Sequence, residues 1–257
     1  MKRSTIITGF LFVICNWIIA FGLSASAKQH FTLSGRITGL QKGDTLRFER
    51  LILPGYGREK AFDIIAEQAD TFSYSGTQCH DQQYIMCFYP EHGSVSQSAR
   101  SGLTMIVSDG DRINLAGDVD DIYYCSLSGG LYSDLLLSRS LQLEDSLGIV
   151  RSNYLKKSVE ARANNDKAAA TEYVNLFNNF GVSGSNPGIE RKREAAKAYS
   201  DAHPEGSLYL LVNSLQGLAN DPLQKSKNFY DALSPQLKDS YYGKIYAGEL
   251  SCLERLA

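Results

Sequence analysis

The apolar residues of this 257-residue chain change their spacing near residue 129. Before that point they alternate with polar residues, as in Phe31–Ile37, which puts the apolar side chains on one face of a strand. After Gly129 and Gly130, leucines recur at steps of three and four or their sums, which puts them on one side of a helix. They are Leu131, Leu135, Leu136, Leu143 and Leu147. The change predicts an α+β fold, with an N-terminal antiparallel β-sandwich or open barrel followed by a C-terminal helical bundle.

The first half contains several short runs that are typical of strands separated by turns. Leu46 and Phe48 alternate with polar residues, and Asp70–Gly76 is predicted to be a strand entered from a turn. Tyr84–Tyr89 is rich in aromatic residues and has no breaker, which is typical of a strand buried on both faces. The Ser108–Asp111 cluster lies between two apolar runs and predicts a hairpin. Short strands at this spacing favour a sandwich or an open barrel.

The second half is predicted to contain five or six helices joined by short loops. The first carries the leucine stripe up to Leu147, and the second runs from Val150 to Phe180 with Gly181 at its C-cap. A third is expected over Ile189–Ala202, stopped by Pro204. Capping residues mark the predicted starts of three further helices, at Ser207 (a helix through Leu218), Asp221-Pro222 and Ser234-Pro235. Each apolar stripe needs burial, so we expect the helices and the β domain to share an interface.

The N-terminus has the three parts of a secretory signal peptide. Lys2 and Arg3 supply the positive charge, Ile6–Leu23 is uncharged and mostly apolar, and Ala25-Ser26-Ala27 is a small-x-small cleavage pattern. Cleavage after Ala27 is favoured over retention as a membrane anchor, and over lipidation at Cys15. The predicted organisation is a signal peptide over 1–27, a β domain over 28–128 and a helical domain over 129–257.

The mature chain is mildly acidic. Without the signal peptide it has 24 basic and 28 acidic side chains, a net charge near −4. Nucleic-acid binders need a basic face, so this charge argues against a nucleic-acid partner. No later segment approaches the apolar length of a membrane-spanning helix, so we expect membrane contact only through an uncleaved signal peptide.

Four cysteines remain after cleavage, at Cys79, Cys87, Cys125 and Cys252. Disulfides persist in exported proteins, and four cysteines allow three pairings. None of them forms the Cys-x-x-Cys spacing that lowers a thiol pKa for redox work. Cys79 and Cys87 are eight residues apart, which suits either a structural disulfide or two unrelated buried thiols. We expect structural roles for these thiols.

No catalytic, cofactor-binding or metal-binding constellation is predicted. The four histidines are isolated from one another, at His30, His80, His92 and His203, so zinc or copper ligation has little support. Nucleophile-elbow, serine–x–x–lysine and phosphate-loop motifs do not occur. We therefore expect no cofactor.

Two acidic clusters and two tyrosine pairs are candidates for sugar or calcium binding. Asp118, Asp120 and Asp121 follow a predicted strand, and Glu144-Asp145 lie on a predicted helix. Paired carboxylates serve glycoside hydrolysis, and acidic turns bind calcium, but a solvated acidic surface is the favoured interpretation. The pairs Tyr123-Tyr124 and Tyr241-Tyr242 suit sugar or protein surfaces, and packing is favoured for them.

The order of short motifs resembles a known family. They are Phe31-x-Leu33-x-Gly35-x-Ile37-x-Gly39-Leu40, Gly43-Asp44-x-Leu46, Phe72-x-Tyr74-x-Gly76, Ile106-Val107-x-x-Gly110-Asp111-x-Ile113-x-Leu115-x-Gly117, Ser128-Gly129-Gly130, His203-Pro204-x-x-Ser207 and Leu233-Ser234-Pro235-x-Leu237-x-x-Ser240-x-Tyr242-Gly243. This arrangement resembles the N-terminal domain of unknown function, with its helical linker, of exported bacterial thioredoxin-like proteins. These are the TlpA-like and AhpC/TSA-type thiol–disulfide oxidoreductases of Gram-negative bacteria.

The resemblance implies a location in the periplasm or cell envelope and a thioredoxin-like protein as partner. Proteins of that family continue into a thioredoxin-like domain with Trp-Cys-x-x-Cys, for which this sequence has no counterpart. We interpret the chain as a stand-alone version of the module or a shortened product of a longer gene. The expected function is a non-catalytic module that binds a partner protein or a ligand. The alternatives are a thiol-dependent redox enzyme using Cys79 or Cys87, and a glycan-binding module using exposed tyrosines and the Asp118–Asp121 turn.

Overall fold

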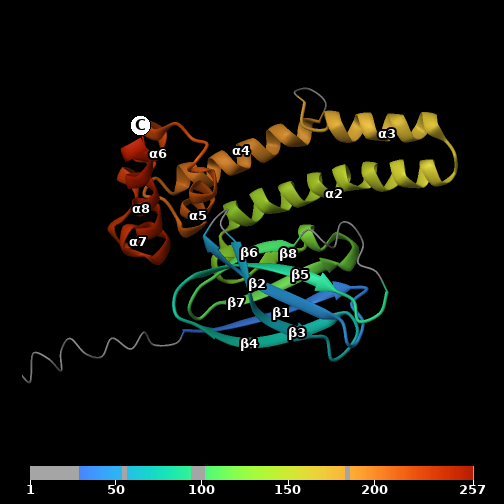
Figure 1. Cartoon of the computed structure of the whole chain (residues 1–257), viewed down its shortest axis with the longest axis horizontal. Coiled ribbons are helices and arrows are strands. Elements are labelled where there is room, and N and C mark those ends of the chain that lie inside the picture. Colours follow the sequence, from blue (N-terminus) through green and yellow to red (C-terminus); the bar gives the residue numbers. More distant parts are fainter. Residues whose placement is uncertain (1–28, 54–56, 94–101, 183–185, 257) are drawn as a thin grey trace, which may run out of the picture.

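The computed structural model describes residues 29–53, 57–93, 102–182 and 186–256. It consists of a β-sandwich followed by a helical part that lies along one side of it (Figure 1). The predicted α+β class, with strands first and helices second, is confirmed. The predicted signal peptide and its cleavage site at Ala27 lie outside the described residues.

Two four-stranded sheets form the sandwich. Sheet A has the order β4 (Thr71–Gln78), β1 (Gln29–Thr38), β7 (Arg112–Asp118) and β8 (Ser126–Ser128). Sheet B has the order β3 (Gly57–Ile65), β2 (Thr45–Leu53), β5 (Gln82–Tyr89) and β6 (Leu103–Val107). All neighbouring strands are antiparallel except β1 and β7, which are parallel. The antiparallel prediction is therefore wrong for this one pair.

The parallel pair follows from the way the chain changes sheets. The Ser108–Asp111 turn was predicted to close a hairpin, but β6 pairs with β5 and β7 pairs with β1. The turn instead passes from sheet B to sheet A. It is fixed by the Asp111 carboxylate, which accepts the Ser108 N–H at 2.7 Å, and by the Gly110 N–H, which donates to the His30 carbonyl at 2.8 Å. Gly110 has a φ of +75°, which other residues rarely adopt.

The sandwich core lies between the two sheets. Alternate residues of each strand point into it, and the fully buried members include Leu33, Leu46, Phe48, Met86, Met105 and Leu115. Strand β5 is buried on both faces as far as Phe88, as its sequence predicts, while Tyr89 at its end is exposed. One face of β5 meets the sandwich core. The other face contributes to the interface with the helices.

The helical part begins with two short 3-10 segments and a long helix. These are η1 (Val119–Tyr124), η2 (Gly130–Ser133) and α2 (Leu135–Ala163). The predicted helix end near Leu147 is wrong, because α2 continues through Gly148. Gly148 does not end the helix. It allows the close approach of Tyr124, because a Cβ at this position would lie 2.0 Å from the Tyr124 ring.

Helix α2 ends inside the predicted Val150–Phe180 helix, at an Asn164–Asp166 turn in which Asn165 has a φ of +60°. The Asp166 side chain then caps α3 (Lys167–Asn179). The predicted second helix from Val150 to Phe180 is therefore two antiparallel helices. Helices α3 and α4 (Pro187–Ala202) both run along α2, and together the three form a long hairpin that projects past the sandwich (Figure 1).

Four further helices form a compact cluster at the other end of α4 (Figure 1). They are α5 (Leu208–Gly217), α6 (Leu223–Ala232), α7 (Pro235–Asp239) and α8 (Tyr241–Leu256). The predicted caps at Ser207 and Ser234 are confirmed, since each hydroxyl accepts a backbone N–H of the following turn. Asp221 does not cap α6, which starts after Pro222 without a side-chain cap. None of the described helices is both long and apolar enough to cross a membrane.

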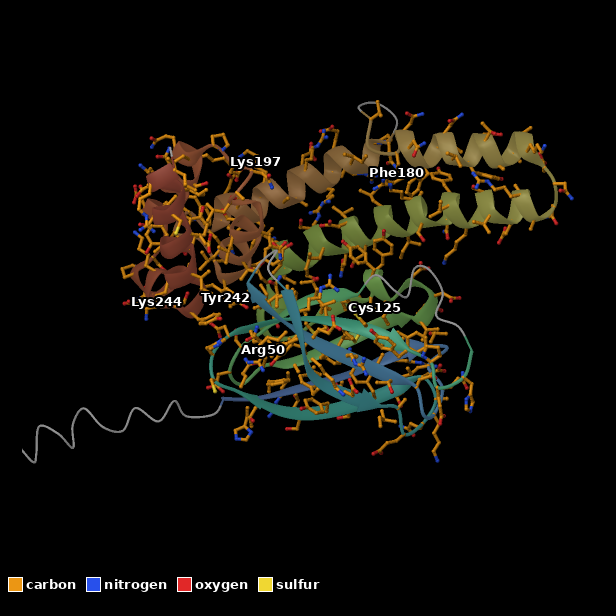
Figure 2. All side chains as sticks on the ribbon, viewed as in Figure 1. Arg50, Cys125, Phe180, Lys197, Tyr242 and Lys244 are labelled. Carbon is orange, nitrogen blue, oxygen red and sulfur yellow. The ribbon has the colours of Figure 1, made fainter. Side chains whose placement is uncertain are left out.

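The predicted interface between helices and β domain is present. Ile106 of β6 packs into the core of the helical cluster with Leu211, Val212 and Tyr242. Figure 2 labels Tyr242 at the end of the cluster nearest the sandwich. The Tyr242 hydroxyl accepts the Gln83 N–H at 2.7 Å, and the Tyr132 hydroxyl accepts the Ile106 N–H at 2.8 Å. Two buried hydrogen bonds and a shared apolar core therefore hold the two parts together.

Candidate functional site

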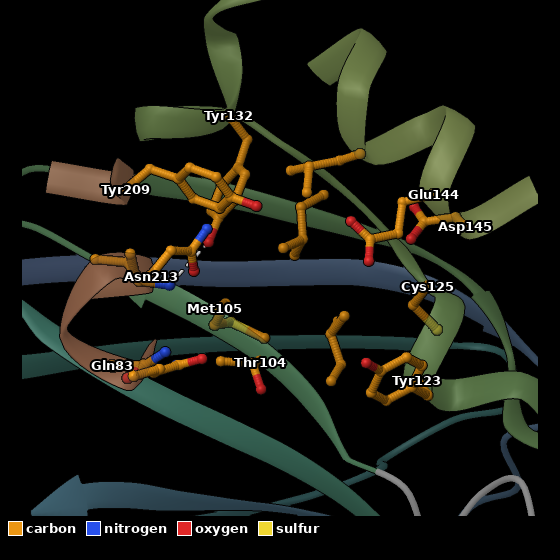
Figure 3. Close-up of a pocket in the computed structure, with 15 residues that line it drawn as sticks. Gln83, Thr104, Met105, Tyr123, Cys125, Tyr132, Glu144, Asp145, Tyr209 and Asn213 are labelled. Atoms are coloured by element: carbon orange, nitrogen blue, oxygen red, sulfur yellow. Dashed lines mark hydrogen bonds between the residues drawn. The ribbon is translucent and has the colours of Figure 1, made fainter. Parts of the chain in front are cut away.

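A cavity of about 300 Å³ lies at the junction of the sandwich and the helices (Figure 3). Its polar wall comes from β5, η1, α2 and α5, and includes Gln83, Tyr123, Glu144, Asp145, Tyr209 and Asn213. Its apolar wall includes Leu103, Met105, Ile106, Leu127 and Leu141. The polar groups thus come from strands and helices that are distant in the sequence. We call this cavity the junction pocket.

The free edge of β6 forms one side of the junction pocket. Strand β6 is the last strand of sheet B, and all four residues of Leu103–Ile106 line the cavity. The Ile106 N–H points away from β5, because it donates to the Tyr132 hydroxyl. Alternate residues of a strand direct their N–H groups to the same edge, so the Thr104 N–H faces this side too. The strand edge therefore offers backbone groups as well as side chains to the pocket.

Gln83 is the most unusual residue of the pocket wall. Only 2% of its surface is exposed, yet its Oε1 atom has no hydrogen-bond partner among the described residues. Its backbone is fixed on both sides, since the N–H donates to Tyr242 and the carbonyl accepts from the Gln82 Nε2 at 3.1 Å. A buried acceptor without a donor costs about 1–3 kcal/mol. Gln83 thus brings to the pocket wall a buried acceptor that has no donor among the described residues.

Two neighbouring carboxylates of α2 line the opposite end of the pocket. Glu144 forms a salt bridge with Lys192 of α4, with 3.1 Å between Nζ and Oε1. Asp145 forms no salt bridge or hydrogen bond with the described residues. Burial, together with a smaller contribution from the Glu144 charge, raises the pKa of Asp145 to about 7, although Lys192 opposes the rise. The pocket therefore contains one carboxylate without a cationic partner.

The phenols of Tyr132 and Tyr209 in the pocket remain neutral hydrogen-bonding groups. Burial raises the pKa of Tyr132 and of Tyr209. Tyr209 is hydrogen-bonded to the side chain of Asn213, one turn further along α5. Tyr132 already accepts the Ile106 N–H, so its own proton is left to donate. Together these groups give the pocket wall both donors and acceptors around an apolar centre.

The cysteine in the pocket wall is an unreactive thiol. Cys125 lies between the sandwich and α2 (Figure 2) and is almost completely buried. Burial raises its pKa to about 12. Since the thiolate is the nucleophilic form, this environment works against thiol chemistry at Cys125.

No disulfide joins any two of the four cysteines in the described part of the chain. Cys79 follows β4 in sheet A, whereas Cys87 lies near the far end of β5 in sheet B. A strand rises about 3.3 Å per residue, so the length of β5 keeps these two side chains apart. Cys87 is buried, which raises its thiol pKa, while Cys79 and Cys252 are exposed.

The histidines are distributed over separate contacts. His80 stacks on Tyr241 with 3.7 Å between ring centroids, and His203 Nε2 lies 3.1 Å from an Asp134 carboxylate oxygen. His30 and His92 are exposed. Among the described residues, no group of three or more histidine, cysteine or acidic side chains is placed to hold a metal ion.

The acidic cluster after β7 has local structural partners. Asp118 caps η1 by accepting the Asp120 N–H at 2.8 Å. Asp121 forms a salt bridge with Lys156 at 2.9 Å and accepts a hydrogen bond from Ser152. These contacts fasten η1 to α2. Of the two acidic clusters in the sequence, Glu144-Asp145 is the one that lines the junction pocket.

Sequence reasoning missed the amide side of the pocket. Gln83, Asn213 and Tyr209 were not predicted, although one indication was present: two glutamines, Gln82 and Gln83, directly precede the predicted doubly buried strand Tyr84–Tyr89 and belong to β5 in the structure. Buried amides need partners, so such a pair indicates either a hydrogen-bond network or a ligand.

The sequence matches no known protein-family model and no curated protein. The resemblance to thioredoxin-associated N-terminal domains therefore depends on the motifs quoted above.

Proposed function

We propose that this protein is a non-catalytic, exported module of the cell envelope that binds a small polar ligand in the junction pocket. The observation that carries the proposal is the Gln83 Oε1 acceptor, which is buried in the pocket wall without a donor. A native protein rarely leaves such a group unpaired, and a ligand donor would remove the cost. A cavity of about 300 Å³ is at the lower end of the range for small-molecule sites.

Binding is favoured over catalysis by the kinds of groups that meet in the pocket. Nucleophilic catalysis needs an activated nucleophile next to a base. The thiol here, Cys125, has its pKa raised to about 12 by burial, and the buried phenols of Tyr132 and Tyr209 are likewise kept protonated. Such groups hold and orient a ligand by hydrogen bonds. The thiol-enzyme alternative loses support at Cys87, where burial raises the pKa as well.

The exported location and the envelope partner are supported by the sequence alone. The charged, apolar and small-residue parts of Lys2–Ala27 favour export, and the motif resemblance favours a separate thioredoxin-like protein as partner. Expression of the full-length chain in a Gram-negative host, followed by mass measurement of the periplasmic product, tests cleavage after Ala27. A product that retains residues 1–27 in the membrane fraction would contradict this part of the proposal.

Ligand binding is tested with two matched tryptophan variants. Gln216 is an exposed residue of α5 that lines the pocket, and Gln224 is an exposed residue of α6 outside it. Gln216→Trp should fill the pocket mouth, whereas Gln224→Trp places the same ring elsewhere. A fragment library of small amines, polyols and acids is screened by ligand-observed NMR against the wild type and both variants.

We expect hits that bind the wild type and Gln224→Trp but not Gln216→Trp. If no compound distinguishes Gln216→Trp from the wild type at affinities up to about 10 mM, the proposed function is wrong; millimolar binding is the weakest that such a site should show.

A further inference from the structure

We propose that the ligand of the junction pocket is a small primary amine with a hydroxyl group at its other end, its ammonium held by Asp145 and its hydroxyl by the Gln83 Oε1. This inference rests on the proposed function and names the chemical class of the ligand. It follows from the charge of the pocket, from the unpaired acceptor at each of its two ends and from the apolar side chains between them.

The charge of the pocket favours the binding of one cationic group. Glu144 and Asp145 both line the cavity, but Lys192 forms its salt bridge with Glu144. Among the described residues that line the cavity, none is a lysine, an arginine or a histidine. One carboxylate, Asp145, therefore remains unpaired in a half-buried position, where an opposite charge within about 4–6 Å would stabilise its ionised form.

The opposite end of the pocket, at Gln83, favours a ligand group that donates a hydrogen bond. The Gln83 Oε1 can only accept, and its two lone pairs are unused among the described residues. A ligand hydroxyl or amine satisfies it, whereas an ether, an ester or a carboxylate does not. The unpaired groups at both ends, Gln83 Oε1 and the Asp145 carboxylate, are thus acceptors, and an anionic ligand is disfavoured.

The two ends are separated by apolar side chains. Figure 3 shows Gln83 and Asn213 on one side of the pocket and Glu144 and Asp145 on the other, with Met105 between them. Leu127 and Leu141 also line the wall, which suits the methylene groups of a ligand. Tyr123 lines the wall on the carboxylate side, where an aromatic face adds attraction for an ammonium group.

The size of the cavity fits a short amino alcohol. A volume of about 300 Å³ equals the share of roughly ten water molecules in the liquid. A straight-chain aminopentanol has seven heavy atoms, so it can enter without displacing the wall. Larger glycans do not fit in this volume.

The environment of Asp145 also predicts how binding depends on pH. The titratable groups that act on it are Glu144 on α2 and Lys192 on α4, and its own charge is felt by Tyr124, Cys125 and Tyr209 on the facing elements. A raised pKa of about 7 means that a proton competes with the ammonium for the carboxylate below that pH. Amine affinity should therefore rise several-fold between about pH 6 and pH 8, while the amine itself stays charged.

The test compares three probes by isothermal titration calorimetry at pH 8. Aminopentanol carries both groups, pentanediol replaces the ammonium by a neutral hydroxyl, and pentylamine lacks the hydroxyl. We expect aminopentanol to bind at least tenfold more tightly than pentanediol and severalfold more tightly than pentylamine. Asp145→Asn should remove the preference for aminopentanol over pentanediol, and Gln83→Met should remove its preference over pentylamine.

Asp239→Asn, an exposed substitution on α7, is the matched control and should leave all three affinities unchanged. Equal binding of pentanediol and aminopentanol, both abolished by Gln216→Trp, would overturn the amine assignment and leave the proposed function standing. Library hits at the pocket that are all acids would do the same. If Asp145→Asn does not unfold cooperatively, the pH series on the wild type decides: an aminopentanol affinity that does not change between pH 6 and pH 8 overturns the assignment.

Discussion

The hydroxyl of Tyr242, at the start of the last helix, accepts the backbone N–H of Gln83 at 2.7 Å across a sequence separation of 159 residues. Both residues are buried, and Gln83 is also the pocket residue whose side-chain oxygen has no donor among the described residues. One hydrogen bond therefore both joins the helical cluster to the sandwich and sets the position of a pocket residue.

Tyr242→Phe should destabilise the protein by about 1–3 kcal/mol, because the buried Gln83 N–H loses its acceptor. In a chain of this size that corresponds to a loss of about 2–4 °C in Tm per kcal/mol. Tyr241→Phe is the matched control, since the adjacent Tyr241 is 37% exposed and keeps its ring stacked on His80. Thermal unfolding of both variants checks the prediction, and equal Tm values for the two would contradict it.

Gln83→Met and Gln82→Met should change stability in opposite directions. Gln83→Met removes an unpaired buried acceptor and keeps the side-chain length, so the ligand-free protein should become more stable by up to about 1 kcal/mol. Gln82→Met removes an Nε2 group that donates to the Gln83 carbonyl at 3.1 Å, so it should be destabilising. Urea unfolding without ligand measures the free energy of unfolding of both variants. A Gln83→Met variant less stable than Gln82→Met would refute the conclusion that the Gln83 Oε1 has no donor.

Gly148→Ala and Gly248→Ala make the same change in two helices with different surroundings. A Cβ at Gly148 would lie 2.0 Å from the Tyr124 ring, whereas nothing lies within 4 Å of a Cβ at Gly248. Gly248→Ala should stabilise by about 0.5–1 kcal/mol through helix propensity. Gly148→Ala should destabilise by about 1–3 kcal/mol through overpacking against η1. Denaturant midpoints of the two variants decide, and stabilisation by both would show that η1 does not pack on α2 as described.

The stability of the ligand-free protein should fall as pH rises through the range in which Asp145 loses its proton. Burial raises the pKa of Asp145 in the folded protein to about 7, from its ordinary value of 3.8. Between these two values the unfolded chain has released the proton and the folded chain still holds it, so stability decreases with pH until about pH 7. Asp145→Asn should abolish this part of the dependence, whereas Asp239→Asn should not. Urea midpoints at pH 5 and pH 8 measure it; the same slope in Asp145→Asn and the wild type would rule out Asp145 as its source.

Much of the secondary structure was predictable because its determinants are local. The alternation in Phe31–Ile37 gave β1, and the hydroxyls of Ser207 and Ser234 cap the helices that follow them. Strand β3 was not predicted, because its first half contains three consecutive charged residues, Arg58–Lys60. It is held by pairing with β2 and by cross-strand salt bridges, Arg50–Glu59 among them, which depend on residues of another strand.

The sequence by itself determined the class of the fold and the order of its two parts, since periodicity and capping act between residues a few positions apart. Only the tertiary structure decided that β1 and β7 are parallel, that Gly148 lies under Tyr124, and that α2 continues past it. The tertiary structure also determined which residues meet in the junction pocket. Gln83, Asp145 and Asn213 lie on β5, α2 and α5, and nothing in these three segments indicates that the residues meet. They meet because the helices pack where the sandwich is open, between its edge strands β6 and β8. Contacts between segments so distant in the chain produce no periodic pattern in the sequence, so the sequence could not predict them.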